Sequence, residues 1–219
     1  MYSGGQERSN RTLHQELVNL TGKRKGVSFT YVPYCHEGSE LYYNRAVQRY
    51  RSFGVRKFNF LDIDTPKGPN SDSLKKAFQS DIIYLSGGNT FYFLKNIKRS
   101  GLLKPLRKYV AEGGVIAGLS AGAHIMTPHI QLAGLKGTDP DKNEVGLKSF
   151  SALNLVPFEF IPHFNPSTQG IKAVKKYSNS SKNPIYASAD GGGIVIRDDR
   201  FTVYGKAWIF YEGEMLRLT

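Results

Sequence analysis

The sequence contains a single cysteine, Cys35, among 219 residues, so a disulfide within the chain is excluded. It also lacks any apolar stretch close to the roughly 18 residues that a membrane-spanning helix needs. The first residues, Met1 to Glu7, contain no apolar core of the kind found in secretory signal peptides. Together these absences predict a cytoplasmic protein that does not associate with membranes.

Metal and nucleotide motifs are absent as well. The sequence has neither an HExxH pattern nor paired Cys-x-x-Cys motifs, and Asp139 and Asp141 are interpreted as loop carboxylates. Gly87 and Gly88 lack the spaced third glycine of a dinucleotide fingerprint and the Lys-Ser/Thr pair of a phosphate-binding loop. We therefore expect no metal and no cofactor.

Acidic residues are scarce: the sequence has 18 Asp and Glu residues and 30 Lys and Arg residues, which gives a net charge of +12. A basic chain can attract nucleic acid through counterion release. The basic residues are nevertheless scattered over segments with the pattern of solvated helix faces. We therefore do not expect nucleic acid binding as the primary role, and the positive field is better suited to attracting small acidic substrates.

Apolar runs alternate with helical patterns along most of the chain. This alternation predicts an α/β fold with a mostly parallel sheet and helices on both faces, in one catalytic domain spanning residues 1–219. Short strands separated by turns near the C-terminus predict an antiparallel extension that covers one edge of that sheet or lengthens it. Residues 127–146 are expected to be a loop. The expected helices are 39–53, 71 or 72–78, 90–100 and 103–112, and the expected strands are 27–32, 58–61, 82–85, 115–117, 158–161, 185–187, 193–197, 201–204, 208–211 and 215–218.

The most informative motif is Gly118-Leu119-Ser120-Ala121-Gly122, which lies between an apolar run and the start of a predicted helix. A G-x-S-x-G sequence at a strand-to-helix turn is typical of a nucleophile elbow, where the serine stands clear of its neighbours. Small flanking residues also let substrate and a second strand approach closely. Ser120 is therefore the candidate nucleophile, and the alternative is an ordinary small-residue turn with a capping serine.

A serine nucleophile needs a base, and the chain offers five histidines. His163 is the best candidate because it follows a predicted strand, at the edge where active sites of open α/β sheets gather. His124 lies one helical turn beyond Ser120 and is expected to be packed rather than to act as the base. His14, His36 and His129 are expected at the surface or in loops.

The orienting acid and the oxyanion hole have weaker signals. Asp190 lies in a glycine-rich turn after a predicted strand, although aspartate is also a common turn residue. The resulting chain order, serine, histidine, acid, differs from that of α/β-hydrolases. Gly88 and Ala121 are the candidate oxyanion-hole donors, with a phosphate-binding loop as the rival interpretation of the glycines.

A Cys35 nucleophile assisted by His36 is disfavoured because adjacent residues on an extended chain point to opposite sides.

Taken in order, Leu85-Ser86-Gly87-Gly88-Asn89-Thr90-Phe91, Gly118-Leu119-Ser120-Ala121-Gly122-Ala123 and Pro162-His163-Phe164 resemble the dipeptidase E (aspartyl dipeptidase) and cyanophycinase family. The resemblance implies a serine peptidase on a flavodoxin-like, class I glutaminase-type sheet, with Ser120 as nucleophile, His163 as base and Asn89 as a substrate-binding residue. Family members carry a glutamate as third member of the triad, in a turn that matches the one holding Asp190.

The resemblance also implies a substrate, namely dipeptides with an acidic N-terminal residue, bound by a monomer or homodimer. A cyanophycinase-like β-aspartyl peptide hydrolase and a non-catalytic binding protein on the same fold are the alternatives.

The sequence departs from the family pattern at two places. The hydrophobic strand that usually opens the chain is missing before Ser3-Gly4-Gly5, and the arginine-containing segment after His-Phe is replaced by 165–170 followed by Lys172, Lys175 and Lys176. We therefore expect a weaker preference for acidic residues than the family shows.

Overall fold

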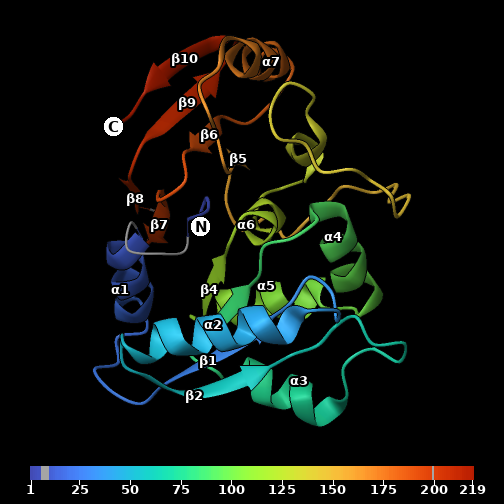
Figure 1. The fold of residues 1–219 in the computed structure, drawn as a ribbon, viewed down its shortest axis with the longest axis vertical. Coiled ribbons are helices and arrows are strands. Elements are labelled where there is room, and N and C mark those ends of the chain that lie inside the picture. The colour runs from blue at the N-terminus through green and yellow to red at the C-terminus, as the bar shows by residue number, and fades with distance from the viewer. Residues whose placement is uncertain (6–9, 199) are drawn as a thin grey trace.

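A parallel sheet of four strands forms one half of the molecule (Figure 1). The computed structural model describes residues 1–5, 10–198 and 200–219. The strand order is β2-β1-β3-β4, and each neighbouring pair is parallel. The bounds are β1 Val27–Val32, β2 Val55–Phe60, β3 Ile82–Leu85 and β4 Val115–Gly118.

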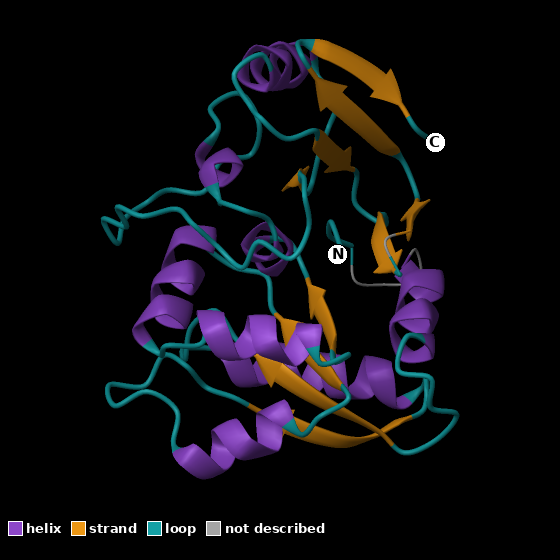
Figure 2. Cartoon of the chain, turned by 180° about the vertical axis from the view of Figure 1, so that it is seen from behind, coloured by secondary structure: helices purple, strands orange, loops and turns teal. Residues whose placement is uncertain are grey.

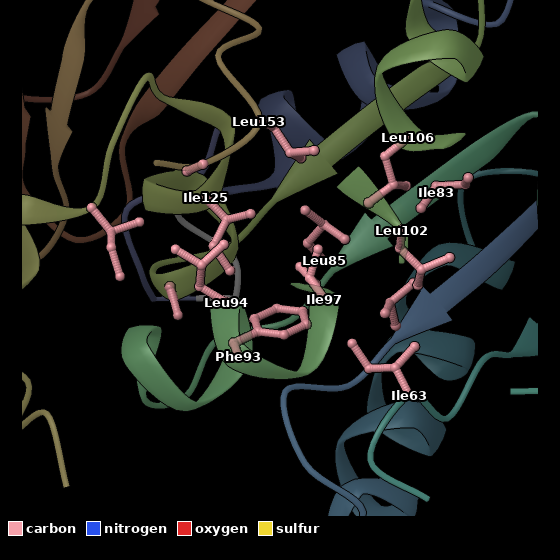
Figure 3. Close-up of a cluster of buried hydrophobic side chains, with 14 of the residues drawn as sticks. Ile63, Ile83, Leu85, Phe93, Leu94, Ile97, Leu102, Leu106, Ile125 and Leu153 are labelled. Carbon is pink, nitrogen blue, oxygen red and sulfur yellow. The ribbon is translucent and has the colours of Figure 1, made fainter. Parts of the chain in front are cut away.

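Helices cover both faces of this sheet, as its buried strands require. Along β3, Ile82 and Tyr84 pack into one apolar cluster, whereas Ile83 and Leu85 pack into the other. The two sets alternate because successive side chains of a strand point to opposite faces. The first cluster includes residues of α1 (Arg11–Asn19) and α2 (Ser39–Arg51). The second, drawn in Figure 3, includes residues of α3 (Ser71–Phe78), α4 (Thr90–Arg99) and α5 (Leu103–Ala111).

The C-terminal strands form a second sheet, seen from behind in Figure 2, with the order β10-β9-β6-β5. Within it β5 and β6 are parallel, whereas β6-β9 and β9-β10 are antiparallel. Beside it lies an antiparallel hairpin, β7-β8. The bounds are β5 Glu159–Ile161, β6 Ile185–Ser188, β7 Gly193–Arg197, β8 Arg200–Tyr204, β9 Ala207–Tyr211 and β10 Glu214–Arg217.

This arrangement confirms the α/β class and the antiparallel C-terminal strands, which form two sheets of their own beside the parallel one. Tyr2 bridges the parallel sheet to the hairpin, pairing with Leu119 in parallel and with Gly193 in antiparallel fashion. A bridge of one residue does not continue the ladder, so the strands separate into distinct sheets. The segment that carries Tyr2 therefore lies inside the molecule, between β4 and β7, where the N-terminus is marked in Figures 1 and 2.

Several local expectations need correction. The N-cap of α3 is Asn70, whose side chain accepts a hydrogen bond from the Ser73 N–H, and not Ser71 or Asp72. The strand expected at 58–61 begins at Val55. His14 was expected at the surface or in a loop, yet it is buried in α1, where its Nδ1 lies 3.1 Å from the Tyr50 hydroxyl.

Three further elements complete the chain. These are α6 (Ala121–Met126), the short 3₁₀ helix η2 (Gln131–Gly134) within the expected loop, and α7 (Thr168–Ser178). In Figure 1, α6 lies between the two sheets. Among the described residues, no helix combines the length and the apolar character that crossing a bilayer requires.

Candidate active site

Ser120 occupies the sharp turn between β4 and α6. Its backbone has φ 50° and ψ −107°, a conformation that L-residues rarely adopt and that costs free energy. Two glycines make room for this turn. A Cβ atom added to Gly118 would lie 2.3 Å from the Gly122 carbonyl oxygen, and one added to Gly122 would lie 2.4 Å from the Leu85 carbonyl oxygen. The glycines of the G-x-S-x-G motif therefore allow α6 to pack directly against β3 and β4.

Ser120, His163 and Asp190 form a continuous hydrogen-bonded chain. His163 Nε2 lies 2.8 Å from Ser120 Oγ, and His163 Nδ1 lies 2.6 Å from Asp190 Oδ1. A carboxylate accepts hydrogen bonds only, so Nδ1 carries the proton in this arrangement and Nε2 is free to accept the Ser120 hydroxyl proton. The side chains remain accessible, with exposed fractions of 37% for His163 and 59% for Asp190.

The three side chains come together because three strand ends meet. Ser120 follows β4, His163 follows β5, and Asp190 follows β6. His163 also has a left-handed backbone, with φ 54°, and it is followed by Phe164, whose N–H donates to the Ser188 carbonyl oxygen at 3.0 Å. The three side chains therefore lie at the carboxyl ends of strands, where the two sheets meet.

Gly88 and Ala121, the predicted oxyanion-hole donors, both lie beside the elbow. Ala121 is the first residue of α6, so its N–H has no acceptor within the helix. A Cβ atom added to Gly87 would lie 3.6 Å from Ser120 Cβ, which places the Gly87-Gly88 segment next to Ser120. Gly88 has φ 140°, and a Cβ atom there would overlap the Tyr34 ring, so this position requires glycine.

Asn89, the predicted substrate-binding residue, is not brought into the cavity that Ser120 opens onto. Its side chain caps α4 by accepting from the Tyr92 N–H at 2.9 Å, and it donates to the Lys142 carbonyl oxygen at 3.0 Å. Thr90, the next residue, does line the cavity, and its N–H donates to Asp141 Oδ2 at 2.8 Å. The structure therefore gives Asn89 the role of holding the loop that carries Asp141 against α4.

A cavity of about 490 Å³ opens beside Ser120 and His163. Its lining is mostly polar, and the charged side chains among the described lining residues, apart from the histidines, are the carboxylates of Asp139 and Asp141. The Thr90 hydroxyl is buried and has no hydrogen-bond partner. The remaining lining residues are His124, Leu132, Ala133, Gly137, Thr138, Pro140, Ile161, Pro162, Phe164, Asn165, Ser167 and Gln169.

His124 lines this cavity but is packed, as expected. Burial, together with the nearby charge of His163, lowers the pKa of His124 to about 3, so its imidazole is neutral over the physiological range. Its imidazole makes no hydrogen bond to Ser120 within the described part of the chain, and only its backbone N–H donates to the Ser120 carbonyl oxygen, at 3.0 Å. A neutral imidazole next to the triad can contact substrate without adding a charge.

The remaining sequence candidates lie elsewhere. His36 is exposed and pairs with Asp62, and burial raises the pKa of the Cys35 thiol, which disfavours its nucleophilic form. Glu159, the first residue of β5, is buried and accepts from the hydroxyls of Tyr177 and Ser181, so its carboxylate is not directed at His163. In the described ranges, no group of three or more His, Cys, Asp or Glu side chains is placed to hold a metal ion.

The three lysines of α7 do not reach the site either. Lys175 pairs with Glu214 at 3.2 Å, while Lys172 and Lys176 are exposed and lie along a different surface hollow. Lys172 and Lys176 therefore belong to a solvent-exposed face of α7.

Sequence reasoning missed two residues next to the triad. The Ser3 hydroxyl accepts a hydrogen bond from the His163 N–H at 2.7 Å. A Cβ atom added to Gly4 would lie 2.2 Å from Asp190 Oδ1 and 2.4 Å from His163 Cε1. The only local signal for these two residues was a Ser-Gly-Gly turn at 3–5, far in sequence from His163 and Asp190. The order of residues along the chain does not place this turn at the site.

Comparison with known proteins supports a peptidase. The model of Peptidase family S51 matches residues 1–204. An uncharacterized peptidase of Listeria monocytogenes is 35% identical over 187 residues, which cover 82% of this chain and 84% of that protein. Peptidase E of Salmonella heidelberg is 30% identical over 154 residues, which cover 66% of this chain and 65% of that protein.

Solved structures agree with this result. The crystal structure of a candidate peptidase E from Listeria monocytogenes EGD-e superimposes with a TM-score of 0.71 and 26% identity, covering 100% of this chain and 96% of that one. A peptidase from an acI-B1 Actinobacterium has a TM-score of 0.77 at 19% identity, covering 100% and 92%, and so shares the fold. With the family match extending over nearly the whole chain, the protein belongs to Peptidase family S51.

Proposed function

We propose that this chain is a serine peptidase that hydrolyses short peptides with Ser120, His163 and Asp190. The observation that carries the proposal is the hydrogen-bonded chain Ser120–His163–Asp190 at the mouth of a polar cavity. His163 Nε2 takes the proton of Ser120 Oγ as this oxygen attacks the peptide carbonyl carbon, and it returns the proton to the departing amine. Water then attacks the acyl-enzyme by the same route, which restores Ser120 and releases the acid.

The tetrahedral intermediate in this mechanism needs donors for its negative oxygen. We assign that role to the backbone N–H groups of Gly88 and Ala121, since both lie beside the elbow and helix N-termini favour negative charge. The N-terminal segment and the loops after β4, β5 and β6 all contribute to the arrangement, which supports one catalytic domain over residues 1–219.

The cavity also supports a substrate class. Asp139, Asp141 and the unpartnered Thr90 hydroxyl offer acceptors, and an ammonium group offers three donors and no acceptor. The free N-terminus of a short peptide fits this chemistry. An acidic side chain would have to be desolvated without a cation, since no Lys or Arg is among the described lining residues. Dipeptides with an acidic N-terminal residue should therefore be cleaved with little preference over neutral ones.

The test is a panel of Asp-Leu, Ala-Leu, β-aspartyl-Leu and N-acetyl-Ala-Leu, assayed with the parent and with Ser120→Ala. We expect turnover by the parent alone, kcat/KM for Asp-Leu and Ala-Leu within about tenfold, which is about 1.4 kcal/mol, and a loss of at least about tenfold on acetylation. Asp139→Asn should reduce turnover of the free peptides and leave the slow acetylated one unchanged.

Each alternative gives a distinct outcome in the same panel. Peptide binding without turnover would favour the non-catalytic binding protein, and turnover confined to β-aspartyl-Leu would favour the cyanophycinase-like hydrolase. A thousandfold preference for Asp-Leu would contradict the substrate class proposed here, and equal rates with the acetylated peptide would contradict ammonium recognition.

A further inference from the structure

The Ser3 hydroxyl connects the two loops that carry His163 and Asp190. It is fully buried, with an exposed fraction of 0%. Its oxygen accepts from the His163 N–H at 2.7 Å, and its hydrogen is donated to the Ser188 carbonyl oxygen at 2.8 Å. Ser188 ends β6, two residues before Asp190, so one hydroxyl links the end of β6 to His163, the second residue after β5.

His163 needs this support because of its backbone. A non-glycine residue at φ 54° lies in the left-handed region, which costs on the order of 1 kcal/mol and persists only when the surroundings hold it. The imidazole direction follows from the backbone position, and the ring must reach Ser120 on one side and Asp190 on the other. The hydrogen bond that the His163 N–H donates to the Ser3 hydroxyl fixes the position of the His163 backbone.

The segment around Ser3 touches every member of the triad. The Tyr2 carbonyl oxygen accepts from the Ser120 N–H at 3.0 Å, and the Gly4 carbonyl oxygen accepts from the Gly191 N–H at 3.2 Å, next to Asp190. The Gly4 α-carbon lies directly against the imidazole and the carboxylate, where any added Cβ would overlap both. Residues 2–4 therefore form a common support for the nucleophile, the base and the acid.

We propose that Ser3 is a positioning residue, whose hydroxyl holds the His163 imidazole in line between Ser120 and Asp190. The role rests on the proposed serine peptidase function. Ser3 does not line the substrate cavity, so its loss should act on the chemical step and leave peptide binding unchanged. A misplacement of about 1 Å in a catalytic group can cost about 10²-fold in rate.

The experiment compares Ser3→Ala with a matched control, Ser178→Ala. Ser178 is equally buried, at 1%, and its hydroxyl also donates to a backbone carbonyl, that of Lys175 at 2.9 Å, and accepts from a backbone N–H, that of Gly213 at 3.0 Å. Both variants lose one donor and one acceptor, so both should be destabilised to a similar degree. We expect Ser3→Ala alone to lower kcat, by about 10- to 100-fold, with KM within about twofold.

A third variant, Ser3→Cys, covers the case in which Ser3→Ala does not fold. It keeps the side-chain shape but replaces the hydroxyl with a weak donor and weak acceptor, so kcat should again fall at unchanged KM. The rate at which a fluorophosphonate labels Ser120 should fall in parallel, because labelling needs the same base. Urea unfolding of each variant measures the stability change separately.

The outcomes separate this role from the proposed function. Labelling of the parent and not of Ser120→Ala would support the serine mechanism whatever Ser3 does. Equal loss of kcat in Ser3→Ala and Ser178→Ala, or kcat of Ser3→Cys within twofold of the parent, would then overturn the role of Ser3. A parent that neither cleaves peptide nor becomes labelled would overturn the proposed function and this role with it.

Discussion

At the scale of single residues, Asp190, the proposed third member of the triad, is the least typical of the three. Asp190 lies at 2.6 Å from His163 Nδ1, a distance expected for a charge-assisted hydrogen bond. Its side chain is nevertheless 59% exposed, whereas the acid of a typical Ser-His-Asp triad is buried. Solvent weakens the electrostatic part of its contribution, so its main effect is to fix the tautomer and direction of the imidazole.

Replacing the carboxylate tests this role. In Asp190→Asn the amide can donate to Nδ1, which places the imidazole proton on Nε2 and prevents it from accepting the Ser120 proton. By analogy with serine proteases, kcat should fall by about 10⁴-fold with KM little changed. Asp198→Asn is the matched control, since Asp198 is an exposed turn aspartate between β7 and β8. Activity of Asp190→Asn within a few-fold of the parent would remove Asp190 from the triad.

These residues also show what the sequence could and could not reveal about the site. Ser120 and His163 carried strong local signals, because an elbow motif and a histidine after a strand each point to the carboxyl edge of a sheet. Ser3 and Gly4 carried only the signal of a Ser-Gly-Gly turn, which does not place them at the site. Their importance arises from contacts across more than 150 residues of chain, as in the hydrogen bond between Ser3 and His163, and single-sequence periodicity contains no information on such pairing.

At the scale of elements, the site depends on how closely α6 approaches β3. The Gly122 N–H donates to the Ser86 carbonyl oxygen at 3.0 Å, just past the end of β3. The absence of a side chain at Gly122 is what allows this backbone-to-backbone contact. The elbow conformation of Ser120 follows from this packing, since the serine immediately precedes the helix.

Gly122→Ala should therefore destabilise the protein despite improving the helix propensity of α6. The added methyl would lie 2.4 Å from the Leu85 carbonyl oxygen, which belongs to a buried strand and cannot move freely. Overpacking costs about 1–3 kcal/mol, and a contact of 2.4 Å with buried backbone belongs to the upper part of that range. This cost exceeds the gain of at most about 1 kcal/mol from replacing glycine in a helix. Urea unfolding measures the difference.

Gly87→Ala provides the control for that measurement. Gly87 lies beside the same elbow, but a Cβ atom there would have its nearest neighbour, Leu119 Cγ, at 3.5 Å, an ordinary contact distance. Its unfolding free energy should stay within about 0.5 kcal/mol of the parent. Equal stability of Gly122→Ala and Gly87→Ala would mean that α6 can move away from β3 at little cost.

The bounds of a helix or strand could be predicted where its own sequence shows a clear pattern of apolar residues. The strands β1, β3 and β7 have the bounds expected from their apolar runs. The helix α1 was not expected from the sequence, and its buried face includes the polar residue His14. The division of the strands among three sheets could not be predicted, since it depends on the two single-residue bridges that Tyr2 makes to Leu119 and Gly193.

At the scale of the whole molecule, two buried histidines make the unfolding free energy depend on pH. Burial lowers the pKa of both His14 and His124 to about 3, from a usual value of 6.5. Below pH 6.5 the unfolded chain takes up protons at these side chains and the folded protein does not. Their contribution to stability is therefore fully present above pH 6.5 and is lost progressively as the pH falls toward 3. At pH 5 each histidine should lower the unfolding free energy by about 2 kcal/mol.

His14→Gln isolates this effect away from the active site. The parent should lose stability steadily between pH 7 and pH 5, and the variant should lose about 2 kcal/mol less over the same interval, because glutamine does not titrate. His36→Gln is the control: His36 is exposed, and the carboxylate of Asp62 raises its pKa, so its removal cannot flatten the curve. Urea unfolding at each half unit of pH gives the two slopes. Parallel curves for the parent and His14→Gln would show that His14 becomes protonated within the folded protein, and that the cluster of His14 with the Tyr2 and Tyr50 hydroxyls opens to solvent without global unfolding.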